Sequence, residues 1–137
     1  MNTFVKTVDL LHRALSANVV RRAVIADNIA NADVPNFKRS TVNFESELKR
    51  ALDSGRQRPA LELTQTDARH FNNHRERDWR DVQIRRVVDF TSVYTNNGSN
   101  VDPEQEFMLA LQNQMTFELL ASAVDFEFSQ ITRVLRG

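Results

Sequence analysis

Apolar residues recur every three or four positions over the first part of the chain, a spacing that places them along one face of an α-helix. Steps of four and three residues from Phe4 to Ala32 reach nine positions, and only Asn18 and Arg22 among them are polar. A polar residue at such a position can fix the register or the number of partner helices. The pattern therefore predicts one helix from about Thr3 to Ala32, with an apolar row made of Phe4, Val8, Leu11, Leu15, Ile25, Ile29 and Ala32.

This predicted helix carries a second apolar row beside the first, which we expect to widen its buried face. The members of the second row are Val5, Val19, Ala23, Ala26 and Ala30. At 1.5 Å per residue the helix would be ~45 Å long. A compact domain of this size could hardly cover such a length, so we expect a coiled-coil-like pairing with another helix.

A second long helix is predicted from Asp102 to the end of the chain. Asp102 suits the N-cap, Pro103 suits the first helical position, and Glu104 and Glu106 complement the positive end of the helix dipole. Steps of three and four residues then reach nine positions, of which only Gln114 is polar. The apolar positions are Phe107, Ala110, Phe117, Ala121, Val124, Phe128, Ile131 and Leu135, and Met108, Leu111, Met115 and Leu119 flank them.

The middle of the chain is mixed in pattern. Residues 41–52 predict a short amphipathic helix, 61–64 a short strand, and 83–94 one or two strands rich in β-branched and aromatic residues. The remaining stretches, 53–59, 66–70 and 95–100, have the composition of loops and turns. The expected fold is mainly α, divided into an N-terminal helix over 1–33, a small irregular or β-containing middle over 34–101, and a C-terminal helix over 102–137.

The stretch from Asn28 to Arg39 is predicted to end the first helix. Asn28, Asn31 and Asp33 have short polar side chains that hydrogen-bond nearby backbone and favour helix ends. Pro35 removes a backbone donor and pushes the preceding residue out of the helical region. Phe37 then places an aromatic ring where it can pack back against the helix. On residue chemistry alone, an ordinary helix stop explains this stretch as well as a functional motif does.

The same stretch resembles the N-terminal motif of bacterial flagellar rod, hook and hook-associated proteins. That motif usually reads Asn-Ile-Ala-Asn, a short run, and then Pro-Gly, an aromatic residue and Lys. The matching residues here are Asn28, Ile29, Ala30, Asn31, Pro35, Phe37 and Lys38. Asn36 stands where Gly is usual, and Asn is the residue after Gly that best tolerates a left-handed backbone.

A second segment, Asn97 to Asp102, resembles the run that commonly precedes the last helix of the proximal rod proteins. The ending Asn100-Val101-Asp102 matches the usual run Asp-Gly-Asn-Asn-Val-Asp, whereas Asn97 and Ser99 differ from it. With both ends matched and only a small middle, the chain is similar to the proximal members of the flagellar basal-body rod family. Its short middle makes it most similar to one of these proximal rod proteins in particular, and the neighbouring proximal rod proteins of similar size are the alternative.

Composition removes several functions from consideration. The formal net charge is zero, so the general basic field of a nucleic-acid-binding protein is not present. The chain has no cysteine, which rules out thiolate chemistry. The run from Met1 to Lys6 lacks the features of a secretory signal, and no apolar run approaches the ~20 residues that cross a bilayer. The residues from Arg75 to Arg86 interleave both signs of charge, which is typical of a solvated segment with weak ion pairs around Trp79.

Candidate catalytic chemistry is sparse. His70 and His74 are four residues apart and could share a helix face as metal ligands, with Asp67 and Asp78 nearby, but a third ligand is not evident. His12 is expected to be exposed. No nucleophile, base and orienting group are combined, so we expect no enzyme, no cofactor and no small-molecule substrate. A small metal-dependent enzyme using the two histidines stays as an alternative.

The predicted helices carry more apolar surface than a helix hairpin can bury, which favours polymerisation through the two ends of the chain. We expect the assembly contacts to come from Phe4, Val8, Leu11, Leu15, Ile25, Ile29, Phe107, Phe117, Val124, Phe128, Ile131 and Leu135. The alternative from another class is a free-standing helical adaptor or secretion-associated chaperone, in which both rows would close into one bundle.

The resemblance implies more than the pattern does. It implies a structural subunit of the rod that transmits torque for motility, exported by the flagellar type III apparatus without a cleaved signal and assembled in the periplasm at the rod base. The partners that it implies are further copies of the chain, other rod proteins, and the MS-ring and export-gate components.

Overall fold

The computed structural model describes residues 3–55, 67, 77–92 and 96–136. Two long helices, α1 (Thr3–Ala30) and α3 (Pro103–Arg136), lie at the two ends of the chain. Between them lie β1 (Ser40–Asn43), α2 (Glu45–Ser54), the 3₁₀ turn η1 (Trp79–Asp81) and β2 (Arg85–Val88). The chain forms two compact units, one made of Met1–Val42 with Arg86–Gly137 and the other of Asn43–Arg85. The mainly-α class expected from the sequence is confirmed.

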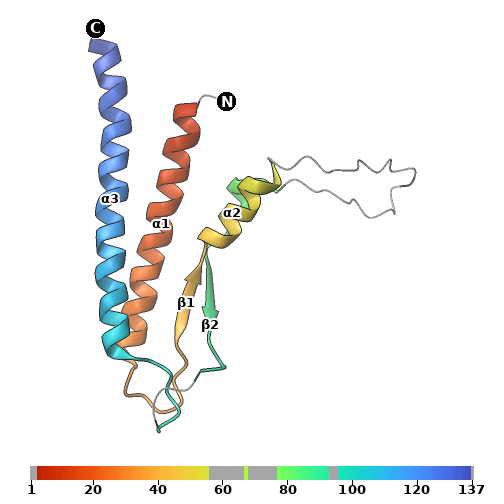
Figure 1. Cartoon of the computed structure of the whole chain (residues 1–137), viewed down its shortest axis with the longest axis vertical. Helices are drawn as coiled ribbons and strands as arrows, with labels where there is room; N and C mark the ends of the chain where they lie inside the picture. The colour runs from red at the N-terminus through yellow and green to blue at the C-terminus, as the bar shows by residue number, and fades with distance from the viewer. Residues whose placement is uncertain (1–2, 56–66, 68–76, 93–95, 137) are drawn as a thin grey trace. The chain divides into compact units, whose positions relative to one another are not determined.

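The first unit is built on an antiparallel hairpin of α1 and α3, which lie side by side in Figure 1. The ring of Phe4 meets that of Phe128 edge to face, with centroids 6.0 Å apart. Further along, the Asn113 amide bonds the Asn18 carbonyl and the Asn28 amide bonds Glu106. Progress along α1 therefore runs backward along α3, and a single register joins the two helices.

The hairpin buries one stripe of each helix. Ala17, Val24 and Ile25 are the buried apolar residues of α1, and most other members of its first predicted row are half-buried. The expectation that the second row would widen the buried face is wrong for this unit. Its five members are all exposed, with Val19 58% exposed, because one partner helix covers only one side of α1.

Helix α1 ends at Ala30, two residues earlier than expected, and a two-stranded sheet follows it. The helix expected over 41–52 is wrong in its first residues, since Thr41–Asn43 belong to β1 and α2 begins only at Glu45. β-branched Thr41 and Val42 suit an extended strand. Strand β2 falls within the predicted segment 83–94, and the two strands run in opposite directions in Figure 1. The expected strand at 61–64 lies outside the described residues.

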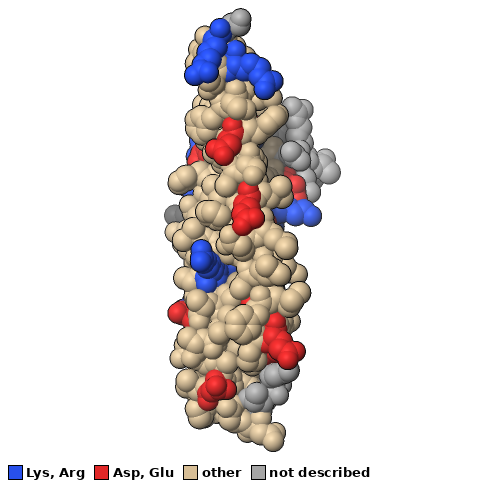
Figure 2. Space-filling view, turned by 90° about the vertical axis from the view of Figure 1, so that its left-hand side faces the viewer, with Lys and Arg blue, Asp and Glu red and all other residues tan. Residues whose placement is uncertain are grey.

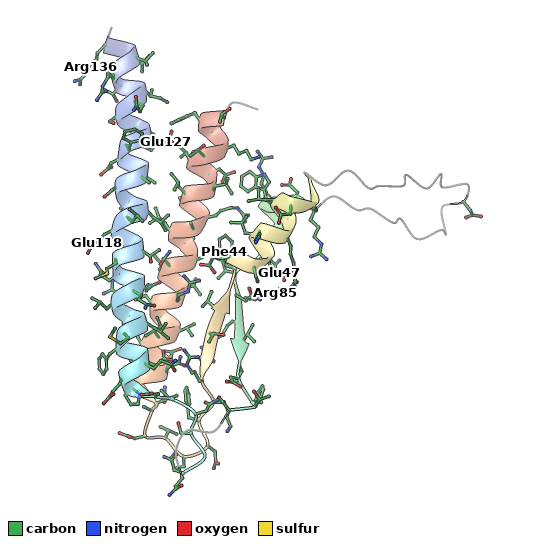
Figure 3. The ribbon with its side chains drawn as sticks, viewed as in Figure 1. Phe44, Glu47, Arg85, Glu118, Glu127 and Arg136 are labelled. Carbon is green, nitrogen blue, oxygen red and sulfur yellow. The ribbon has the colours of Figure 1, made fainter. Side chains whose placement is uncertain are left out.

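The second unit contains α2 and η1. Phe44 and Ala51 are buried, and the Asp78 side chain caps η1 by accepting from the Arg80 N–H at 2.9 Å. Glu47 pairs with Arg50 at 2.8 Å and with Arg77 at 3.6 Å. Figure 3 labels Phe44, Glu47 and Arg85 among the side chains of this unit. In the described part of the charged segment, Arg77 is 65% exposed in its ion pair, so that pair is solvated as expected, while its weakness stays a prediction.

Candidate functional site: the junction of the two turns

The two stretches that resemble the flagellar motifs meet at one end of the helix hairpin. The Asn36 N–H donates to the Asn97 carbonyl at 3.1 Å, and the Lys38 ammonium donates to the Gly98 carbonyl at 2.9 Å. The Arg39 N–H donates to Asn100 Oδ1 at 2.5 Å. Segments some sixty residues apart in the sequence are thereby tied together, and we call this region the junction.

Within the first motif, Asn28 bonds a residue 78 positions away in the sequence. Its side chain is fully buried, and its amide exchanges two hydrogen bonds with the backbone of Ser40. Asn28 Oδ1 accepts from the Ser40 N–H at 3.0 Å, while Nδ2 donates to the Ser40 carbonyl at 2.8 Å. Asn28 was expected to bond its own local backbone, which is wrong. Asn31 does so, donating to the Asp27 carbonyl at 2.7 Å.

Glu106 completes this buried set from the first turn of α3. Its side chain is 0% exposed, and it accepts a hydrogen bond from Asn28 Nδ2 at 3.1 Å and forms an ion pair with the Arg39 guanidinium. A buried carboxylate is tolerated only when it is paired and hydrogen-bonded. The end of α1, the start of β1 and the start of α3 are therefore joined through one carboxylate.

From the sequence, Glu106 is expected only to complement the helix dipole, and Arg39 has no expected role. A signal was present. Glu106 lies four residues before Ala110, which is half-buried, and seven before Asn113, which is buried. This spacing places all three on one face of the helix. The apolar row predicted from the sequence begins instead at Phe107, which is 61% exposed, because a carboxylate is an unusual member of a buried row.

The turn after α1 has the geometry that its residues predict. The Phe37 N–H donates to the Val34 carbonyl at 3.2 Å, with Pro35 and Asn36 between them. Asn36 has φ of 60°, and a positive φ at the third position of a turn whose second position is proline matches a type II turn. The expected left-handed conformation of Asn36 is confirmed. Pro35 and Ala30 are exposed, whereas Ile29, Phe37 and Lys38 are half-buried.

The other turn approaches Asn36 closely. Gly98 has φ of 82°, and a Cβ added there would lie 2.5 Å from Asn36 Oδ1. Only glycine combines this backbone conformation with so little space. The two turns therefore interlock, each with a left-handed residue at the point of contact.

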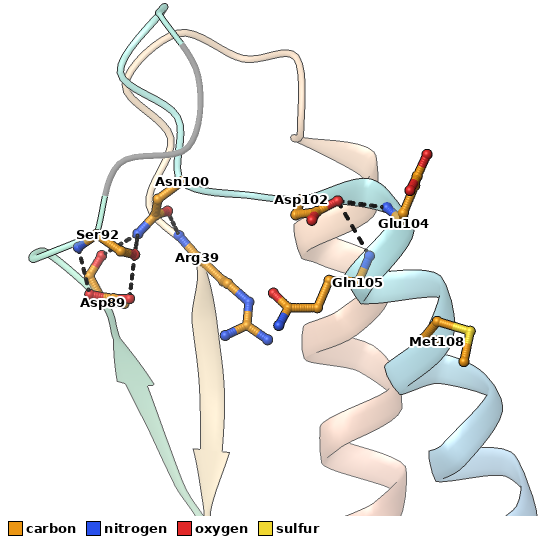
Figure 4. Close-up of a pocket in the computed structure, with 8 residues that line it drawn as sticks. All are labelled: Arg39, Asp89, Ser92, Asn100, Asp102, Glu104, Gln105 and Met108. Atoms are coloured by element: carbon orange, nitrogen blue, oxygen red, sulfur yellow. Dashed lines mark hydrogen bonds between the residues drawn. The ribbon is translucent and has the colours of Figure 1, made fainter.

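Beyond the turns, Asn100 bridges to a loop after β2. Its amide donates to the Asp89 carbonyl at 2.8 Å and to Ser92 Oγ at 3.1 Å (Figure 4). The Asp89 carboxylate accepts from both the hydroxyl and the N–H of Ser92 and of Thr91, and these hydrogen bonds, with the Ser92 hydroxyl foremost, hold its pKa well below the usual range. Asp102 caps α3 by accepting from the Glu104 and Gln105 N–H groups, as the sequence predicts. The carboxylates of Asp89 and Asp102 therefore accept hydrogen bonds from backbone N–H groups.

Metal chemistry finds no support among the described parts of the chain. No group of three or more His, Cys, Asp or Glu side chains there is placed to hold a metal ion. His12 is exposed, as expected. His70 and His74 lie outside the described residues. In the same described parts, no helix has the length and apolarity that a membrane span requires.

The residues expected to drive assembly are divided by the hairpin. Phe4, Val8, Leu11, Leu15, Ile29, Val124 and Ile131 are half-buried, and Ile25 is buried. Phe107, Phe117, Phe128 and Leu135 are exposed on α3. Five more apolar side chains, each at least half exposed, form what we call the outer stripe of α3: Met108, Leu111, Met115, Leu119 and Phe126.

The outer face of α3 has few charges. Figure 2 shows this side of the molecule as mostly uncharged, with separated acidic and basic side chains. Glu118 lies on the side of α3 away from α1 in Figure 3. A helix hairpin with a long exposed apolar stripe is typical of subunits that assemble with neighbours.

Comparison with known proteins gives the family. The profile of the family described as flagella basal body rod protein matches residues 10–38. These residues include most of α1 and the first motif. The flagellar basal body rod protein FlgB of Borrelia hermsii is 40% identical over 99% of this chain and 100% of its own length. The FlgB proteins of Borreliella burgdorferi and Bacillus subtilis are 40% and 33% identical, over 99% and 100% of this chain and 100% and 98% of their own lengths. The chain belongs to the flagellar basal body rod protein family.

Proposed function

We propose that this chain is a structural subunit of the proximal flagellar rod that polymerises through its two terminal helices and transmits torque. Its similarity to proteins named FlgB over nearly the whole chain supports this role. The observation that carries the polymerisation step is the outer stripe of α3, which is apolar, long and exposed.

The energetic argument starts from the outer stripe. Covering a large apolar side chain removes it from water and contributes roughly 1.5–3 kcal/mol. Five such side chains along one helix give neighbouring copies a strong reason to pack together, even after the cost of immobilising them. We infer that the outer stripe of α3 packs against a different face of the next copy, and a heterologous contact of this kind makes a helical filament when it does not close.

The junction contributes a fixed direction to this assembly. Asn28, Arg39 and Glu106 set how the chain leaves α1 and how it enters α3. Close-packed helices with a fixed register resist twisting, because protein interiors have the density of organic crystals. The motif residues Asn28, Ile29, Ala30, Asn31, Pro35, Phe37 and Lys38 therefore serve the geometry of the subunit and carry no catalysis.

The proposed partners are further copies of the chain, other rod proteins, and the MS-ring and export-gate components at the rod base. We place the assembled subunit in the periplasm, after export by the flagellar type III apparatus. This role involves no enzyme activity, nucleic acid or small-molecule substrate.

The test replaces one residue of the outer stripe. Leu119→Glu puts a charge where a neighbour must pack, whereas Thr116→Glu adds the same charge to an exposed position of α3 outside the stripe. Each variant is expressed in flagellated cells that lack their own copy. We expect Leu119→Glu to abolish swimming while the protein is made and helical, and Thr116→Glu to swim. Normal swimming of the Leu119→Glu strain would contradict the proposal.

The helical adaptor or chaperone makes a different prediction. A closed bundle would leave no long apolar stripe in water, and it would stay monomeric and melt cooperatively by itself. Size-exclusion chromatography with light scattering over a concentration series separates the two, since a rod subunit is expected to gain mass as its concentration rises.

A further inference from the structure

Two buried amides face the interface between α1 and α3. Asn18 is 3% exposed and Asn113 is 7% exposed, in the middle of a stripe whose other members are mostly apolar or small. Asn113 Nδ2 donates to the backbone carbonyl of Asn18 at 3.1 Å, while Asn18 Nδ2 donates within its own helix to the Ala14 carbonyl at 3.1 Å. Of these two bonds, the one from Asn113 crosses between the helices and the one from Asn18 does not.

This arrangement is costly. Among the described residues, neither Asn18 Oδ1 nor Asn113 Oδ1 has a hydrogen-bond donor, although both atoms are buried. Leucine at either position would remove the unpaired acceptor and add apolar contact. Helices that keep a polar residue at such a place commonly gain a defined register from it.

The apolar residues of the hairpin specify the register weakly. A slip of one heptad moves α3 by ~10.5 Å along α1 and again sets apolar residues against apolar residues. The same slip would carry Asn113 from Asn18 to the level of Leu11 or Ile25, which belong to the apolar row of α1. The crossing amide would then face branched apolar side chains and lose its acceptor.

The acceptor is reachable at Asn18 for a local reason. Ala17 is 0% exposed and has only a methyl group, so a side chain from α3 can approach the backbone of α1 there. The residues that correspond to Ala17 one heptad away are Leu10 and Val24, whose side chains are larger. We propose that Asn113 is the residue that sets the register of α3 on α1, through its hydrogen bond to the Asn18 carbonyl.

The consequence reaches the junction. Asn28 and Glu106 lie on the same two helices, and their 3.1 Å bond forms only when the helices are in this register. The Asn113 bond and the junction contacts therefore require the same register. It is a positioning residue for the hairpin, and this role is independent of the proposed function in the rod.

The test uses the lack of cysteine in the chain, because introduced thiols are then the sole targets. A cysteine replaces Phe4, and a second replaces Phe128, which faces Phe4, or Ala121 or Leu135, which face it after a one-heptad slip. A thiol crosslinker shorter than the ~10.5 Å slip reports the register. Without further change, we expect crosslinks within one chain only for the Phe4–Phe128 pair.

The decisive comparison is between two matched variants. Asn113→Leu removes the crossing donor, whereas Asn18→Leu keeps it, because the acceptor is the backbone carbonyl of residue 18. We expect Asn113→Leu to lower the preference for the native register by about tenfold, seen as crosslinks at the slipped positions. Asn18→Leu is expected to retain the single native crosslink.

Two outcomes would overturn the assignment. One is a single native crosslink in the Asn113→Leu protein, and the other is equal slippage in both leucine variants. Asn113→Ala is included in case the larger leucine prevents folding, and circular dichroism confirms that each protein is helical. A native crosslink alone in a helical Asn113→Ala protein would also overturn the assignment.

Discussion

Asn28 Nδ2 lies 3.1 Å from Glu106 Oε2, a buried contact between residues 78 positions apart. Neither partner would be stable in this place alone. The Asn28 amide is held by the backbone of Ser40, and the Glu106 carboxylate is paired with Arg39. The contact closes the helix hairpin at the end where both family motifs lie.

The first prediction concerns this carboxylate. Glu106→Ala leaves the Arg39 guanidinium, which is 19% exposed, without its counterion and leaves the Asn28 amide with one donor unpaired. We expect the free energy of unfolding to fall by about 3 kcal/mol, measured by urea denaturation. Glu104→Ala, an exposed change in the same turn of α3, is the control and should have an effect within about 0.5 kcal/mol. Equal losses in the two variants would refute the structural role of Glu106.

The second prediction tests the interlocked turns. Gly98→Ala must adopt a positive φ, at a cost of roughly 1–2 kcal/mol, and its Cβ meets Asn36 Oδ1. Asn36→Gly removes that obstacle while keeping a residue that accepts φ of 60°. In a double-mutant cycle on the free energy of unfolding, we expect Asn36→Gly to relieve part of the loss, with a coupling of about 0.5–3 kcal/mol.

Gly55→Ala is the control for this cycle. Gly55 has φ of −78°, and a Cβ there would have its nearest neighbour at an ordinary 3.8 Å. The alanine should be neutral or slightly stabilising, by up to about 1 kcal/mol. Strict additivity of Gly98→Ala and Asn36→Gly would show that the two turns do not touch in solution.

The third prediction concerns Pro35. Helix α1 ends at Ala30, before Pro35, so the proline shapes the turn that follows and does not itself stop the helix. Pro35→Leu should lower the free energy of unfolding by about 0.4–1 kcal/mol through the freer unfolded chain. We expect it to block motility while leaving expression intact, measured by swimming in soft agar. Val34→Leu, at an exposed neighbour, is the control, and normal swimming of the Pro35→Leu strain would count against the role of this turn.

The fourth prediction is a pH dependence. The pKa of Asp89 is lower in the folded chain than its unfolded value of about 3.9, because Ser92 and Thr91 donate to its carboxylate. The carboxylate therefore stabilises the loop at pH above that unfolded value, and this contribution is lost as the pH falls below it. Ser92→Ala should raise the Asp89 pKa toward the ordinary range, followed by NMR titration of the side-chain carboxyl carbon. An unchanged titration curve would show that the Ser92 hydroxyl does not bond Asp89 in solution.

The fifth prediction concerns the ends of the chain. In the last turns of α3, Val134 is 79% and Leu135 is 80% exposed. The backbone hydrogen bonds of these turns are therefore poorly shielded from water in the free subunit. We expect amides of the terminal turns of α1 and α3 to exchange quickly in the monomer and to become protected on assembly. Hydrogen exchange followed by mass spectrometry checks this. A monomer whose terminal turns are already well protected would contradict assembly through these ends.

Much of the local structure follows from the sequence alone. The two long helices come from the spacing of their apolar residues, and the start of α3 from Asp102 and Pro103, whose side chains act within their own turn. The left-handed conformation of Asn36 after Pro35 is also a local property. The family motif can be recognised in the sequence for the same reason, since its residues form a single turn. Each of these features depends on residues near each other along the chain.

Tertiary structure decided which polar residues lie inside. Asn28, Glu106 and Asn113 are buried because their partners, Ser40, Arg39 and the Asn18 carbonyl, arrive from other elements. It also decided which apolar rows stay in water, since one partner helix covers a single stripe of α1 and leaves its second row exposed. The physical reason is that desolvation of a polar group is compensated only by a partner in space, and hydrophobic periodicity along the chain does not reveal where that partner lies.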